Sequence, residues 1–138
     1  MTTSKKNKLE EARKLLDVAR DQFDGAQVAW YEPAQPAECV TKSFYAYENG
    51  VSAAMLAVGR QRSKKHPEKA AIAKQLFEEK KLKTDVSDLL SHLNDVRKDV
   101  QYGEAGFELK SMNLEQLVAD LELFLDEVEA LLAEIEEA

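Results

Sequence analysis

The sequence predicts an all-α fold, in which a single domain over residues 1–138 forms an antiparallel helical bundle. Apolar residues recur at intervals of three and four along most of the chain, which is the period of one face of an α-helix. Proline, glycine or helix-capping residues separate these periodic segments. Hydrophobic residues make up 44% of the chain, enough to fill the core of one domain of roughly five helices.

The first predicted helix spans residues 4–29 and ends before two prolines that stand within four residues of each other. Neither proline can continue a helix. The second predicted helix, residues 37–59, is apolar on nearly all sides, with Glu48 and Asn49 as its polar interruptions. A helix of this kind packs against several neighbours, so we expect it at the centre of the bundle.

The next two helices are predicted over residues 67–80 and 85–101. The third helix begins with a proline, a residue that suits the first helical position because its missing N–H has no helical partner there. Thr84 or Asp85 caps the fourth helix, because the side-chain oxygens of both residue types accept hydrogen bonds from the first turn. Gly103 then offers a left-handed stop.

The last helix is predicted over residues 113–136, after a loop over residues 103–111. Asn113 is the capping residue, and Met112 is placed to pack against Leu117 across the first turn. An apolar stripe runs the length of this helix and suits either the core or a coiled-coil seam with a second chain. We expect its first half in the core, with self-association open for the rest.

One arginine lies on the apolar side of the fourth helix and needs an explanation. Arg97 follows Leu90 by seven residues and Leu93 by four, so it shares their face. A buried guanidinium is costly unless it is paired, and Glu48 is the carboxylate on an equally apolar helix. We therefore predict an ion pair between Arg97 and Glu48, with the alternative that both residues face a cleft and bind a nucleotide or RNA phosphate.

The composition of the chain restricts metal binding, disulfide formation and membrane contact. Cys39 is the only cysteine, and with His66 and His92 it cannot complete a four-ligand zinc site or form an internal disulfide. We interpret Cys39 as a small buried hydrophobic residue and expect no metal and no cofactor. The chain has no apolar run of membrane-spanning length, which favours a cytoplasmic protein without membrane contact.

The formal charge of -7 is unevenly distributed along the chain. The last predicted helix carries acidic residues and no Lys or Arg, so the rest of the chain is slightly positive. A basic edge follows the second predicted helix, and it consists of Arg60, Arg62, Lys64 and Lys65. This edge suits phosphate binding, although a solvated loop is the more common meaning of such a run.

Two segments, Phe44–Asn49 and Arg97–Gly103, resemble the motifs of the higher eukaryotes and prokaryotes nucleotide-binding (HEPN) family. The resemblance covers most of the chain and is closest to small bacterial members that carry tyrosine rather than histidine five residues after the arginine. It implies an HEPN-like bundle and a homodimer. It also implies that the ligand-binding or phosphate-binding residues are Tyr45, Glu48, Asn49, Arg97, Lys98 and Tyr102.

Family members that cleave RNA carry an arginine, a polar residue and then a histidine, and they need no metal. Here Arg97 and Lys98 match the first two positions, while Tyr102 stands where the histidine would be. A tyrosine hydroxyl has a pKa near 10 and is a poor general base at neutral pH. Arg97 and Tyr102 are therefore the candidate catalytic residues, although the histidine expected as general base is absent from this position.

Three other patterns carry less weight. Arg60 and His66 have the spacing of the nuclease motif, but they flank a predicted connector rather than lying on one helix. His92 precedes Arg97, in the reverse order, and suits an exposed helical position. Two acidic residues, Asp95 and Asp99, stand four apart, a spacing that usually serves only to solvate a helix.

The resemblance favours a noncatalytic binding module, dimeric in the family's manner, from a bacterial toxin–antitoxin or defence-type system. A nucleotidyltransferase or another protein is the partner that it implies, with RNA or a nucleotide as ligand. One alternative is a metal-independent endoribonuclease toxin that uses Arg97 with Tyr102 or with a histidine brought in by folding. Another is a scaffold whose acidic last helix binds a basic partner.

Overall fold

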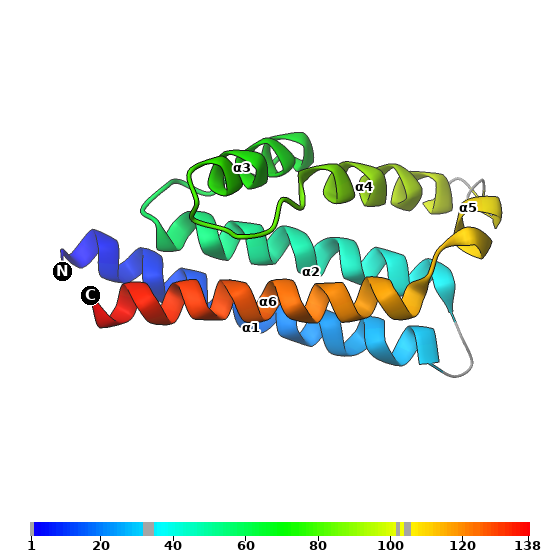
Figure 1. The fold of residues 1–138 in the computed structure, drawn as a ribbon, viewed down its shortest axis with the longest axis horizontal. Helices are drawn as coiled ribbons and strands as arrows, with labels where there is room; N and C mark the ends of the chain where they lie inside the picture. Colours follow the sequence, from blue (N-terminus) through cyan, green and yellow to red (C-terminus); the bar gives the residue numbers. More distant parts are fainter. Residues whose placement is uncertain (1, 32–34, 102, 104–105) are drawn as a thin grey trace.

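The computed structural model describes residues 2–31, 35–101, 103 and 106–138, and the described part contains six helices and no strand. Figure 1 shows the helices running side by side in one bundle. They are α1 (Thr3–Tyr31), α2 (Pro36–Ala57), α3 (His66–Glu78), α4 (Ser87–Gln101), α5 (Gly106–Ser111) and α6 (Leu114–Glu137). The predicted all-α bundle is confirmed.

The prediction missed α5, because residues 103–111 were expected to form a loop. This helix has only six residues, which is too short to show a helical period in the sequence. Its Leu109 packs against the edge of the core. The other helices start and end within a few residues of the expected positions. Gly59 and Lys80 stop α2 and α3 in the left-handed region, with φ of 91° and 62°.

α2 is the central helix, as its all-round apolar pattern predicted, and most of its residues are buried. It packs against α1 and α6 on one side and against α3 and α4 on the other (Figure 1). A Cβ atom on Gly50 would lie 2.9 Å from the ring of Phe124 and 3.1 Å from Leu125. The absent side chain therefore allows α2 and α6 to approach closely.

The apolar stripe of α6 is core for nearly its whole length, since buried residues run from Leu117 to Leu132. Asn113 caps the helix as predicted, accepting a hydrogen bond of 3.0 Å from the backbone N–H of Gln116. Leu123 is the apolar exception, with 66% of its surface exposed. The part of the stripe left for self-association is therefore small.

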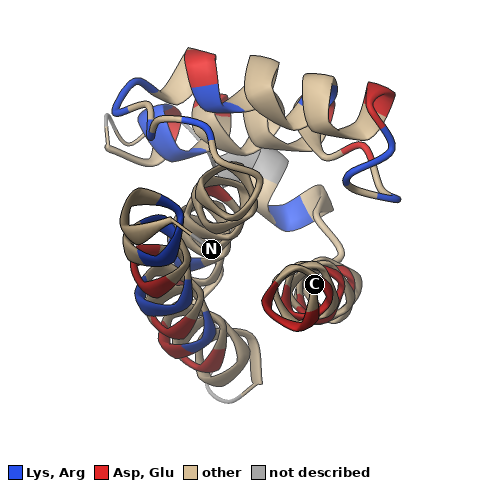
Figure 2. Cartoon of the chain, turned by 90° about the vertical axis from the view of Figure 1, so that its left-hand side faces the viewer, with Lys and Arg blue, Asp and Glu red and all other residues tan. Residues whose placement is uncertain are grey.

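Three acidic residues of α6 pair with arginines of α1, and Figure 2 shows the charged residues of these two helices. Arg13 of α1 contacts Glu129 and donates to Glu136 over 2.6 Å. Arg20, also on α1, lies 2.8 Å from Asp126. No described helix is both long enough and apolar enough to cross a membrane.

Candidate anion-binding site at the junction of α2, α3 and α4

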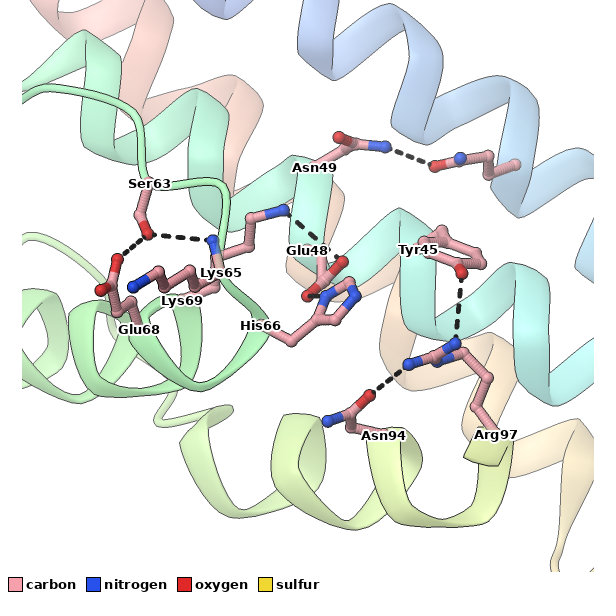
Figure 3. A network of polar contacts seen from close by, with 11 residues as sticks. Tyr45, Glu48, Asn49, Ser63, Lys65, His66, Glu68, Lys69, Asn94 and Arg97 are labelled. Carbon is pink, nitrogen blue, oxygen red and sulfur yellow. Dashed lines mark hydrogen bonds and ion pairs between the residues drawn. The ribbon is translucent and has the colours of Figure 1, made fainter. Parts of the chain in front are cut away.

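Glu48 does not pair with Arg97, so the predicted ion pair is wrong. Its side chain, only 3% exposed, binds two residues of α3 instead (Figure 3). Oε2 of Glu48 lies 2.5 Å from Nδ1 of His66, and Oε1 lies 3.6 Å from Nζ of Lys69. The prediction paired Glu48 with Arg97 because both lie on apolar helix faces. That pattern did not reveal that α3 places two cationic partners closer to Glu48.

Arg97 instead packs on two aromatic residues in the middle of α2. The guanidinium carbon lies 5.1 Å from the ring centre of Phe44 and 5.7 Å from that of Tyr45, within the range of a cation–π contact. Nη2 donates to Oδ1 of Asn94 over 2.8 Å, and Nη1 lies 3.5 Å from the hydroxyl of Tyr45. Nε of Arg97 is buried and has no hydrogen-bond partner among the described residues.

His66 packs on the same two aromatic rings as Arg97. The imidazole centre lies 5.4 Å from the ring centre of Phe44 and 6.5 Å from that of Tyr45. In Figure 3 the side chains of His66, Tyr45 and Arg97 reach into one region between α2, α3 and α4. The fold thus brings a histidine beside the arginine from a different helix, although the sequence motif lacks one.

The charges in this region make it suitable for an anion. Glu48 is occupied by Lys69 and His66, and no other carboxylate in the described part of the chain forms an ion pair with Arg97. The side chain of His66 is 36% exposed, and Tyr45 and Arg97 are half-buried, so a ligand has access to all three. Guanidinium and hydroxyl donors on an apolar floor can bind a phosphate group.

The remaining predicted ligand-binding residues are not gathered here. Nδ2 of Asn49 donates to Oε1 of Gln22 over 2.9 Å, so Asn49 faces α1. Lys98 is exposed on α4. Tyr102 lies outside the described residues. Among the described residues, no group of three or more histidine, cysteine or acidic side chains could hold a metal ion, and Asp95 and Asp99 belong to none.

The predicted basic edge is partly occupied by intramolecular ion pairs. Arg60 contacts Glu79 of α3, and its Nη1 lies 3.3 Å from Oε1 of Gln75. Arg62 lies 3.9 Å from Glu11 of α1. The two lysines that follow, Lys64 and Lys65, are exposed. The arginines of this edge therefore stabilise the connector, which leaves the lysines as its solvated part.

His66 and Lys69 are members of the site that the sequence did not identify. One signal was present, because a histidine just before the proline of α3 falls in the first helical turn, and Lys69 follows one turn later on the same face. Nothing in the sequence showed which helix this face would meet. Cys39 is fully buried, as predicted, and burial raises the pKa of its thiol to about 11.

A scan against models of protein families found no match to this chain, and neither did searches of curated proteins and of solved structures.

Proposed function

We propose that this protein is a noncatalytic helical binding module whose site at Phe44, Tyr45, His66 and Arg97 takes the phosphate group of a nucleotide or of RNA. The state of Arg97 carries this proposal. Its guanidinium is half-buried, and within the described part of the chain its Nε has no hydrogen-bond partner and no carboxylate neutralises it. Such a cation is costly to keep in a protein, and a phosphate bound at the accessible part of the guanidinium would supply the missing negative charge.

The net charge of the chain favours a focused site over a broad nucleic-acid surface. At -7 the protein repels a polyanion, and the arginines of the basic edge are held by Glu79 and Glu11. A single phosphate at Arg97 needs only the local charge. We therefore expect a nucleotide, or one phosphate of a short RNA, rather than a long duplex.

The resemblance to the HEPN family supports the biological setting that we propose. Tyr45 and Arg97, which carry part of that resemblance, meet at the site, where their side chains lie 3.5 Å apart. In this setting the protein is a homodimer of a bacterial toxin–antitoxin or defence-type system. It acts in the cytoplasm with a nucleotidyltransferase or another protein as its partner.

The test is binding of a 5′-phosphorylated ribonucleotide to the purified protein, measured by calorimetry and by amide chemical shifts. Arg97→Met keeps the apolar length of the side chain and removes its charge, so we expect affinity to fall by about tenfold or more. Lys98→Met is the matched control, because it removes one adjacent but exposed charge. Equal affinity of the wild type and Arg97→Met, with both folded, would contradict the proposal.

A metal-independent endoribonuclease is the second candidate, and the position of His66 favours it. His66 contacts the buried Glu48 and shares two aromatic rings with Arg97, which suits a general base beside a group that stabilises the phosphorane charge. It predicts cleavage of a mixed RNA in excess chelator that both His66→Gln and Arg97→Met abolish. Intact RNA after prolonged incubation with the wild type would reject it.

The scaffold hypothesis has less support from the contacts of α6. Three of the nine acidic residues of α6, namely Glu129, Glu136 and Asp126, are engaged by arginines of α1. A basic partner would have to compete with these intramolecular pairs. Association that depends strongly on salt and disappears on truncation near Leu125 would revive this hypothesis.

A further inference from the structure

Each of the two carboxylate oxygens of Glu48 contacts a side chain of α3. His66 and Lys69 stand three apart on that helix and therefore face the same way. His66 lies 2.5 Å from one carboxylate oxygen, and Lys69 lies 3.6 Å from the other. Glu48 and Lys69 are nearly inaccessible, with 2% and 7% of their surface exposed, whereas the imidazole reaches the surface. The buried pair thus supports one accessible side chain (Figure 3).

We propose that Glu48 is a positioning residue that holds His66 in the tautomer with hydrogen on Nδ1, so that Nε2 is the ring atom presented to the ligand. An ionised carboxylate only accepts hydrogen bonds, so Nδ1 must be the donor in this contact. In a neutral imidazole the hydrogen on Nδ1 leaves Nε2 as an acceptor. When the ring is protonated, Nε2 also carries a hydrogen and can donate it to an anion, while Nδ1 stays bound to Glu48. The part of this proposal that concerns the ligand rests on the proposed function of the site.

Lys69 completes the arrangement by holding the second carboxylate oxygen. With both oxygens engaged on the α3 side, Glu48 is not available to neutralise Arg97. This explains why the buried carboxylate of Glu48 and the half-buried guanidinium of Arg97 do not pair with each other. The pair thus has two effects on the site, since it orients the imidazole and leaves Arg97 open to an anion.

The tautomer is measurable without any ligand, by long-range ¹H–¹⁵N correlation of the two histidine side chains at alkaline pH. His92 is exposed on α4 and serves as the internal reference. We expect a single Nδ1–H pattern for His66 and a mixture of tautomers for His92. A mixture, or the Nε2–H form, at His66 of the wild type would overturn the proposal.

The variant Glu48→Met/Lys69→Met removes the acceptor without leaving an unpaired buried charge, so it is more tolerable than either single change. We expect His66 to become a mixture of tautomers in this folded variant, as His92 is in the wild type. Retention of the pure Nδ1–H form would show that Glu48 is not the cause. If the double variant does not fold, the tautomer of His66 in the wild type still tests the proposal.

Inorganic pyrophosphate is the probe for the ligand part. We expect it to bind the double variant about tenfold more weakly than the wild type in mildly acidic solution, because a protonated imidazole that Glu48 no longer holds loses roughly one hydrogen bond from Nε2–H to the anion. Equal affinity would overturn the role of Glu48 toward the ligand. If the wild type shows the Nδ1–H form but binds no anion, the proposed function fails while the positioning of His66 stands.

Discussion

Glu48 and His66 are hydrogen-bonded across the interface between α2 and α3, although 18 positions separate them in the sequence. This contact determines the chemistry of the site, because it occupies the carboxylate that would otherwise be available to Arg97. Lys69 strengthens the same junction from one helical turn further along α3. The stability of α3 on α2 and the charge of the candidate site are therefore coupled.

Replacing Glu48 alone should be more damaging than replacing it together with Lys69. Glu48→Met leaves the ammonium of Lys69 buried without a counterion, and breaking such a pair costs about 3–5 kcal/mol of unfolding free energy. Glu48→Met/Lys69→Met removes both charges and should recover most of that loss. Urea unfolding of the two single variants and the double variant measures the coupling. Losses that simply add would show that the two charges do not stabilise each other.

Two glycines offer a matched test of helix packing. Gly50→Ala places a methyl group 2.9 Å from Phe124, where buried neighbours on α6 cannot move easily, so overpacking of about 1–3 kcal/mol should outweigh the gain in helix propensity. The Cβ of Gly25→Ala meets only the flexible end of Lys42. That variant should gain up to about 1 kcal/mol. Thermal unfolding should separate the two in opposite directions, and equal shifts would contradict the close approach of α2 and α6.

Asp85 should stabilise the start of α4 in a pH-dependent way. Its carboxylate accepts hydrogen bonds from the hydroxyl and the backbone N–H of Ser87, and these lower its pKa below the ordinary 3.8. The stabilisation is therefore present above the ordinary pKa and is lost as the pH falls through the lowered one. Asp85→Ala should cost about 1 kcal/mol at pH 7.

The difference between Asp85→Ala and the wild type should shrink in acid, once the wild-type carboxyl is protonated. Urea unfolding at pH 7 and at progressively lower pH tests this, with Asp95→Ala as the control on the exposed face of α4. A cost that stays constant from neutral pH into acid would assign it to packing rather than to the charge.

Cys39 should resist alkylation in the native protein. The side chain is fully buried, and burial raises the pKa of the thiol to about 11, so little reactive thiolate exists at pH 8. Iodoacetamide should modify the protein only after unfolding in urea, and mass spectrometry can follow the single site. Rapid labelling of the folded protein would contradict the packing of α2 against its neighbours.

Helical periodicity predicted the fold well because each long helix buries one face or, in α2, nearly all of them. The position of Arg97 on the apolar side of α4 was also readable, since it depends only on spacing within one helix. The identity of its neighbours depends on how three helices meet, which no local pattern encodes. His66 shows this most clearly, because its role comes from the docking of α3 onto Glu48.

α3 buries few apolar side chains in the core, and this affects the motions of the site. Apart from Lys69, its buried residues are only Ala70, Ala73 and Leu76, so opening of this helix alone costs less than unfolding the bundle. Each such opening would withdraw His66 and release Glu48 while Arg97 and Tyr45 stay on the larger part. The site would then alternate between an assembled and a disassembled form. Native-state hydrogen exchange of the α3 amides measures how often this opening occurs.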